Sequence, residues 1–121
     1  LPFEDNSFDN VFCCFVWRNV SDTNKALQEV YRVLRPGGKF ILLDMTRPKN
    51  PFLKILHKIG TFKVLHLIGL LTFNLKEYRF LYKSLDFYPQ PENHLKKDTF
   101  IDLQIERMGL FNFVYLAVFT K

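Results

Sequence analysis

The chain has 121 residues, of which 48% are hydrophobic and 24% charged, a balance that is typical of one packed domain and excludes a disordered segment. Its net charge is +5, and basic residues cluster between residues 47 and 63 and at Lys96-Lys97. This charge favours either an anionic partner, such as phospholipid headgroups or nucleic acid, or an ordinary solvated basic surface.

The start of the chain and its cysteines bear on the cellular setting. The sequence begins at Leu1 instead of Met and shows no signal peptide, which suggests part of a longer protein. Cys13 and Cys14 are adjacent in an apolar run, where neighbouring side chains point to opposite faces of a strand, so a disulfide between them is not expected. Two such thiols favour a reducing, intracellular setting over a secreted one.

The first part of the chain predicts a strand, a helix and a second strand with short connections. A continuous apolar run over residues 11–17 favours a strand buried on both faces. Ser21 or Asp22 can cap a helix with apolar residues at three- and four-residue spacing, which the Pro-Gly-Gly turn at 36–38 ends. A second apolar run at 40–43 follows directly. This order predicts a βαβ unit with parallel strands, and therefore an α/β fold.

The rest of the chain predicts mainly helices. Residues 51–73 are apolar but interrupted by lysines and histidines, which disfavours a transmembrane span and favours an amphipathic cover. Such a cover could close over an active site, rest on a membrane surface, or do both. Gly60 and Gly69 are expected to loosen any single helix there. The remaining elements are predicted as helices over 75–87 and 97–108 and a strand over 111–120.

Candidate site residues follow the predicted strands, because ligands of open parallel sheets bind beyond the carboxyl ends of the strands. These residues are Trp17-Arg18-Asn19 and Asp44-Met45-Thr46. Arg18 and Asn19 could orient an oxygen-bearing substrate, or Arg18 could pair with a nearby carboxylate, and the residue types alone favour neither. The three histidines are too scattered to predict a metal site.

Several segments match one family in the correct order. The segments Leu1-Pro2-Phe3 and 5–9 resemble the approach to the fourth strand of class I S-adenosylmethionine-dependent methyltransferases. The following segments resemble the C-methyltransferases of ubiquinone and menaquinone biosynthesis: Arg18-Asn19-Val20, Lys25-Ala26-Leu27, the run 31–38, and Tyr78-Arg79-Phe80-Leu81 with Ser84 and Pro89. The resemblance covers residues 1 to about 110. It implies the C-terminal half of a Rossmann-like class I methyltransferase sheet, with parallel strands flanked by helices.

The resemblance also implies how the chain is organised. Residues 1–121 would form one partial methyltransferase domain. Within it we expect a strand-helix-strand core over 1–46, a helical substrate-side insertion over 47–92, and a C-terminal helix and strand over 93–121.

The family implies methyl transfer from S-adenosylmethionine to a ring carbon of a polyprenylated phenol or naphthol, so a lipophilic quinone precursor is the expected partner. Arg18 is the expected catalytic residue, because a cation beside the ring hydroxyl stabilises the phenolate, directly or through a water that accepts the departing proton. Arg18, Asn19 and Tyr78 are expected to contact the substrate. Cys14 and Phe15 match positions where the family's fourth strand touches the cofactor, and core packing is the alternative for both.

The chain also departs from the family pattern. The glycine-rich turn and the acidic residue that hold the cofactor are missing from this sequence, so this chain alone is expected to bind S-adenosylmethionine weakly or not at all. Val16 and Lys83 stand where the family usually has a glycine and an acidic residue. A shortened C-terminus could leave an exposed sheet edge and allow a homodimer.

Two functional interpretations therefore remain. The leading one is the substrate-side half of a quinone C-methyltransferase, located in the cytoplasm or peripherally on the inner membrane, on the matrix side in a mitochondrion. The alternative is a truncated, non-catalytic protein that acts as an interaction module or binds a membrane surface. Nucleic acid is not an expected partner in either case.

Overall fold

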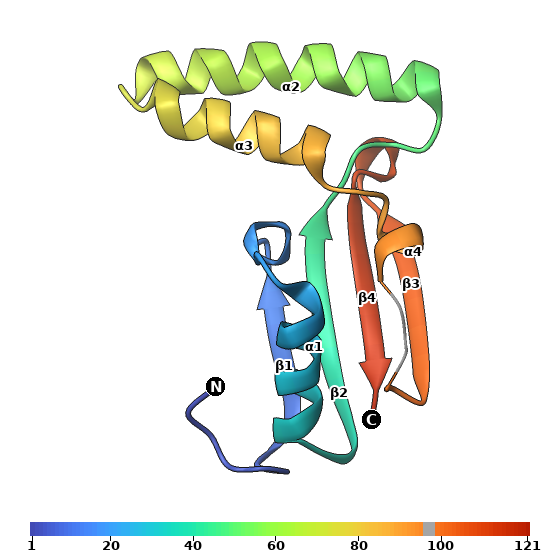
Figure 1. Ribbon diagram of the computed structural model, residues 1–121. Helices are drawn as coiled ribbons and strands as arrows, with labels where there is room; N and C mark the ends of the chain where they lie inside the picture. Colours follow the sequence, from blue (N-terminus) through green and yellow to red (C-terminus); the bar gives the residue numbers. More distant parts are fainter. Residues whose placement is uncertain (96–98) are drawn as a thin grey trace.

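The computed structural model describes residues 1–95 and 99–121, which form one four-stranded sheet with helices beside it (Figure 1). The strands are β1 (Phe8–Cys14), β2 (Leu34–Met45), β3 (Asp102–Met108) and β4 (Val114–Thr120), in the sheet order β1-β2-β4-β3. The helices are α1 (Thr23–Val33), α2 (Pro51–Leu71), α3 (Leu75–Phe87) and the short α4 (Pro91–His94), with 3₁₀ turns η1 (Trp17–Asn19) and η2 (Leu110–Asn112).

The βαβ unit and the α/β fold class are confirmed. β1 and β2 are parallel, with Val11 opposite Phe40 and Cys14 opposite Leu43. Asp22 is the cap of α1, because its carboxylate accepts a hydrogen bond of 2.9 Å from the backbone of Lys25. β4 runs antiparallel to both β2 and β3. The sheet is therefore mixed, and β2 is an interior strand.

The first strand lies earlier than predicted. β1 begins at Phe8 and ends at Cys14, whereas the apolar run continues to Trp17. Phe15 has a φ of 58°, outside the extended region, so the chain leaves the sheet there and forms η1. This turn places Trp17 in the core with 2% of its surface exposed. β1 also lies at an edge of the sheet and not between two strands.

The start of β2 also differs from the sequence prediction. α1 ends at Val33 and β2 begins at the next residue, so the Pro-Gly-Gly segment at 36–38 is part of the strand instead of a turn that ends the helix. Leu34 pairs with Phe8 before a register shift, and the regular pairing starts at Lys39 opposite Asn10.

The helix predicted over 97–108 is wrong in its described part. Asp102–Met108 form β3, in which exposed and half-buried side chains alternate as expected for a strand, and residues 96–98 lie outside the described residues. Gly109, directly after β3, has a φ of 79° and begins the η2 turn of the β3-β4 hairpin. The final strand begins at Val114 and not at residue 111.

α2 is one continuous helix of 21 residues, so Gly60 and Gly69 do not interrupt it. A Cβ added at Gly69 would lie 3.1 Å from the Cα of Leu75, so this glycine lets α3 approach closely. Apolar side chains on α2 are exposed at Phe52, Ile55, Ile59, Phe62, Val64, Leu67 and Leu70. They occur on more than one side of the helix, so the expected amphipathic pattern is not present. Within the described residues, no helix is both long and apolar enough to cross a membrane.

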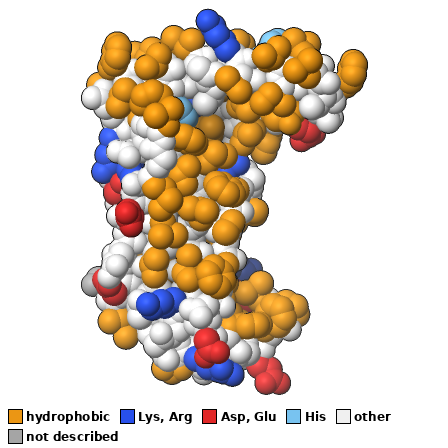
Figure 2. Space-filling model, turned by 180° about the vertical axis from the view of Figure 1, so that it is seen from behind, with side chains coloured by type: hydrophobic (Ala, Val, Ile, Leu, Met, Phe, Trp, Pro, Cys, Tyr) orange, Lys and Arg blue, Asp and Glu red, His pale blue; other side chains and the backbone are white. Residues whose placement is uncertain are grey.

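The hydrophobic core lies on one face of the sheet. α1 and α4 lie in front of the sheet in Figure 1. Side chains of α1 pack there against buried residues of β2 and β4. The buried members are Trp17, Val30, Leu34, Phe40, Leu42, Leu95, Phe100, Tyr115, Ala117 and Phe119. Figure 2 shows the molecule from behind, where hydrophobic side chains run over the surface. Phe12 of β1 is 67% exposed.

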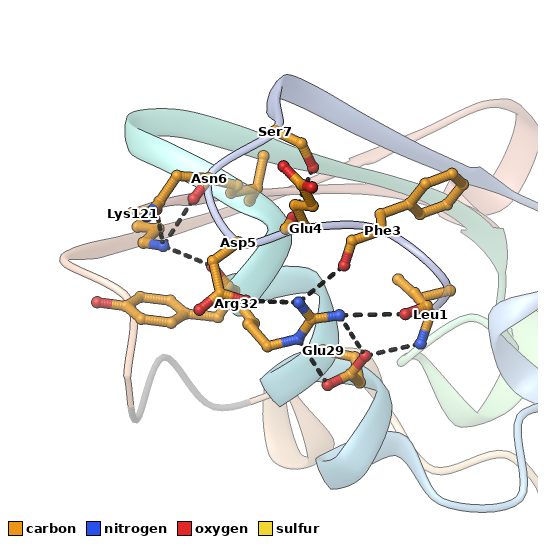
Figure 3. Close-up of polar contacts among 11 residues, drawn as sticks. Leu1, Phe3, Glu4, Asp5, Asn6, Ser7, Glu29, Arg32 and Lys121 are labelled. Carbon is orange, nitrogen blue, oxygen red and sulfur yellow. Dashed lines mark hydrogen bonds and ion pairs between the residues drawn. The ribbon is translucent and has the colours of Figure 1, made fainter.

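Arg32 of α1 holds the segment that leads into β1 (Figure 3). Its guanidinium donates to the carbonyl oxygen of Phe3 at 2.9 Å and to the carboxylate of Asp5 at 2.6 Å. Lys121, after β4, donates to the side-chain oxygen of Asn6 at 2.9 Å. These contacts are exposed and add little stability individually, but together they fix the entry into the first strand.

Candidate functional site

Arg18 is the centre of a polar cluster at the carboxyl end of β1 and β2. Its backbone nitrogen donates to the carboxylate of Asp44 at 3.0 Å, and its Nη1 forms an ion pair with the same carboxylate. Its Nε donates to the hydroxyl of Ser84 on α3 at 3.2 Å. The Arg18 and Asp44 side chains are 6% and 0% exposed. Three elements of the fold therefore meet at this guanidinium.

The Asp44 carboxylate is well satisfied, which a buried charge requires. Besides the two contacts with Arg18, its Oδ1 accepts a hydrogen bond of 2.7 Å from the backbone of Met45. The Nη2 of Arg18 makes no hydrogen bond to any residue in the ranges 1–95 and 99–121. Arg18 is thus paired with a carboxylate and retains one nitrogen that can donate to a ligand.

A second group of polar residues is buried behind this ion pair. The hydroxyls of Tyr88 and Tyr115 and the indole nitrogen of Trp17 interact with one another near Asp44, and none of them forms a well-aligned hydrogen bond to a described residue. Burial raises the pKa of Tyr88 to about 12 and raises the pKa of Tyr115 as well. Burial, followed by the charge of Asp44, also raises the pKa of the Cys13 thiol. These groups stay neutral, and their burial keeps water away from the ion pair, which strengthens it.

The other predicted site residues are only partly brought together. Cys14 and Phe15 are at the same strand end as Arg18, and Phe15 is 43% exposed. Asn19 is exposed on η1, where its backbone donates to the carbonyl of Val16. Tyr78 is elsewhere: it lines a small cavity of about 140 Å³ between α2 and α3. It is six residues before Ser84, which corresponds to about 9 Å along a helix.

Arg47 is a buried residue that the sequence analysis missed. It was placed in an exposed basic cluster, but its side chain is 2% exposed and forms an ion pair of 3.0 Å with Asp86. It also donates to the hydroxyl of Thr61 at 2.9 Å and to Nδ1 of His57 at 3.3 Å, and its guanidinium stacks 5.0 Å from the ring centre of Tyr82. The sequence feature that could have identified it is its position two residues after the end of β2.

The charges around Arg47 are set by these contacts. Burial, with a further contribution from Arg47, lowers the pKa of His57, so this imidazole remains neutral. Burial opposes ionisation of Asp86, but the hydrogen bond from Lys58 and the charge of Arg47 outweigh it and lower the pKa of Asp86. Arg47 therefore connects α2 and α3 to the end of β2 as a satisfied structural cation.

The described residues at this strand end offer a cofactor an apolar surface but no free carboxylate. The exposed side chains of Phe15 and Val16 offer an apolar wall at the strand end. The carboxylate at this edge, Asp44, is already occupied by Arg18 and is not available for ribose hydroxyls. No group of three potential metal-ligating side chains gathers among residues 1–95 and 99–121.

Comparison with known proteins identifies the family. The model of the ubiE/COQ5 methyltransferase family matches residues 1–115. The ubiquinone/menaquinone biosynthesis C-methyltransferase UbiE of Rickettsia bellii is 45% identical over 93 residues, which are 76% of this chain and 38% of the relative. The protein of the same name from Hahella chejuensis is 42% identical over 93 residues, which are 76% of this chain and 37% of the relative.

One solved structure shows a weaker likeness. A SAM dependent methyltransferase from Aquifex aeolicus is 16% identical, with a TM-score of 0.48 over 99% of this chain and 49% of that chain, and adds nothing to the assignment. The chain spans 38% of the length of its Rickettsia bellii relative. Because the family model covers nearly the whole chain, the chain belongs to the ubiE/COQ5 methyltransferase family.

Proposed function

We propose that this chain is the substrate-side part of an S-adenosylmethionine-dependent C-methyltransferase that acts on a polyprenylated quinone precursor. The observation that carries the proposal is Arg18, held by Asp44 and Ser84 at the carboxyl end of two parallel strands, with Nη2 free to donate. Family membership and the names of the relatives agree with this activity. S-adenosylmethionine, when bound, supplies an activated methyl group.

Arg18 raises the reactivity of the ring. Its Nη2 donates to the ring oxygen and stabilises the phenolate, which increases the electron density on the neighbouring ring carbon. Asp44 and Ser84 fix the guanidinium, so little reorganisation is needed when the charge develops. Asn19 is exposed beside Arg18 and binds a second ring oxygen. Cys14 and Phe15 form the wall on the cofactor side, and a water at Arg18 accepts the ring proton.

The cofactor is held mainly by sequence outside these 121 residues. This proposal is supported by the extent of the match, since the chain spans 38% of its Rickettsia bellii relative. The apolar wall at Phe15 and Val16 alone gives few polar contacts. Calorimetric titration of the 121-residue chain is therefore expected to show little binding of S-adenosylmethionine, and a dissociation constant in the micromolar range would contradict this division of roles.

The role of Arg18 is tested by kinetics in the complete natural enzyme. Arg18→Lys keeps a cation for the buried carboxylate of Asp44 but removes the Nη2 donor, so the protein folds and kcat falls about 100-fold. Binding of S-adenosylmethionine changes less than twofold, because Arg18 contacts the acceptor. Arg35→Gln is the matched control, since Arg35 is an exposed arginine paired with Asp9. A folded Arg18→Lys enzyme with unchanged kcat would refute the proposal.

A second function is favoured by the outer side of α2. This helix is the outermost element in Figure 1 and exposes Phe52, Ile55, Ile59 and Leu70. Lys63 is exposed four residues after Ile59 and therefore on the same side, and the helix contains no acidic residue. We propose that this side rests on an anionic phospholipid surface, which would place the enzyme peripherally on a membrane where its lipophilic substrate is dissolved.

β1 is an edge strand, and its outer side pairs with no other strand of residues 1–95 and 99–121. We propose that further strands of the same protein pair with it, because the relatives are more than twice as long as the matched part. The homodimer considered from the sequence is the alternative occupant of this edge.

A further inference from the structure

A large apolar cavity lies between the helix pair and the end of the sheet. Its volume is about 550 Å³, within the range of small-molecule sites. α2, α3, η2 and the last residue of β2 all contribute to its walls. Its lining residues include Met45, Gly60, Val64, Leu81, Leu85 and Phe111.

The cavity offers hydrocarbon surface and little else. His57 and Thr61 are polar residues in its wall, and both are engaged by Arg47. The Thr61 hydroxyl also donates to the backbone carbonyl of His57 at 2.7 Å. Since these groups already have partners, the cavity favours an apolar ligand over an anion or a sugar.

The cavity is next to the Arg18 cluster. Met45 lines the cavity, while the preceding residue, Asp44, holds Arg18. On α3, Leu81 and Leu85 line the cavity, while Ser84 binds the guanidinium. Because neighbouring side chains of a strand point to opposite faces, the polar cluster and the cavity lie on the two sides of the end of β2, and one turn of α3 contacts both. An amphiphile with its ring at Arg18 would have this cavity as an adjacent place for an apolar chain.

We propose that this cavity receives the first isoprenoid units of the substrate's side chain. The inference rests on the proposed function, because only a prenylated acceptor brings such a chain to Arg18. A ring alone would leave the apolar walls exposed to water, whereas a chain removes them from water and positions the ring. The cavity is then a specificity site, distinct from the residues that act on the ring.

Gly60 allows a direct test. A Cβ at this position meets no atom within 4 Å, so Gly60→Leu fills the cavity without a clash in the helix. Leucine is also a better helix former than glycine, so the fold is retained. The matched control is Lys63→Leu, which places the same side chain at an exposed position of α2.

The probe is farnesol, an isoprenoid alcohol without an aromatic ring. Calorimetric titration is expected to show binding to the unmodified chain and to Lys63→Leu, and binding at least about tenfold weaker to Gly60→Leu, because the added side chain occupies the cavity. A diazirine analogue of farnesol is expected to label lining residues such as Leu56, Val64 and Leu81. Equal affinity of Gly60→Leu, no binding to the unmodified chain, or labelling confined to Phe52, Ile55 and Ile59 would overturn the inference. Farnesol has no ring to methylate, so these results are independent of the Arg18 kinetics.

Discussion

Two buried arginines have different roles in this fold. Arg18 contacts Asp44 and Ser84 and keeps Nη2 free of described residues, so it can still bind a ligand. Arg47 donates to Asp86 and Thr61, among others, and its remaining surface is covered by Tyr82. A guanidinium whose donors all point to the protein has no capacity for substrate. Arg47 is therefore expected to matter for stability, and Arg18 for the reaction.

The first prediction concerns Arg47. Arg47→Met removes the cation from a buried site and leaves Asp86 and Thr61 with fewer partners, so the free energy of unfolding is expected to fall by about 3 kcal/mol. Urea denaturation followed by the fluorescence of Trp17, the single tryptophan, measures this change. Lys54→Met is the control, because Lys54 is exposed on α2, and it should change stability by less than about 0.5 kcal/mol. Equal midpoints for both variants would contradict the role of Arg47.

The sequence identified the strand-end position of Arg18 but not its contacts. Local patterns place Arg18 and Asp44 after two apolar runs, and parallel pairing of these runs then brings the two residues to one edge. Ser84 and Asp86 come from a helix 39 residues or more further along the chain. No local sequence pattern predicts that residues so far apart in the chain meet, so a basic residue such as Arg47 was interpreted as exposed.

At the scale of elements, the βαβ unit was predictable because its signals are local. A cap at Asp22, a helical period and two short apolar runs occur within residues 8–45. β3 was not predictable in the same way. Its inward residues, Leu103 and Ile105, are two apart, but the segment is also compatible with a helix before a glycine. Pairing with β4 decides in favour of the strand, which is a tertiary effect.

The second prediction compares the two glycines of α2. Gly60→Ala is expected to stabilise the protein by up to about 1 kcal/mol, because alanine is the better helix former and the site is open. Gly69→Ala gains the same propensity, but its Cβ would lie 3.1 Å from the Cα and the Cδ2 of Leu75 and push α3 away. A net loss of about 1 kcal/mol is expected at Gly69. Thermal unfolding of the pair measures the difference, and an equal gain at both sites would mean that α3 adjusts without cost.

At the scale of the whole molecule, hydrophobic surface is left open in two places. One is the back of the sheet and the edge at β1, where Phe12 is exposed (Figure 2). The other is the outer side of α2, with Ile55 and Ile59. Apolar patches of this kind mark contacts with a partner or a membrane. Both surfaces carry an exposed lysine, Lys39 on β2 and Lys63 on α2, but only the first has an open strand edge, so the two are expected to have different partners.

The charge of α2 leads to the last prediction, that the chain binds vesicles of anionic phospholipid. Each lysine near such a surface contributes about 1 kcal/mol, so replacing Lys63, which is on the same side of α2 as Ile59, by glutamine should weaken binding about fivefold. Replacing Lys25, which is exposed on α1, makes the same change in net charge and should have little effect. Flotation with labelled vesicles measures both, and salt near 1 M, where the Debye length is about 3 Å, should release the unmodified chain.

The outcome distinguishes the possible partners of α2. Equal losses from the two substitutions would mean that net charge alone attracts the chain and that α2 is not the contact. Ile59→Glu removes an apolar contact without altering the lysines, so it should also reduce flotation if the helix rests on the lipid. If the chain instead sediments as a dimer without vesicles and Ile59→Glu makes it monomeric, the outer side of α2 is an interface between two copies, and the membrane proposal fails.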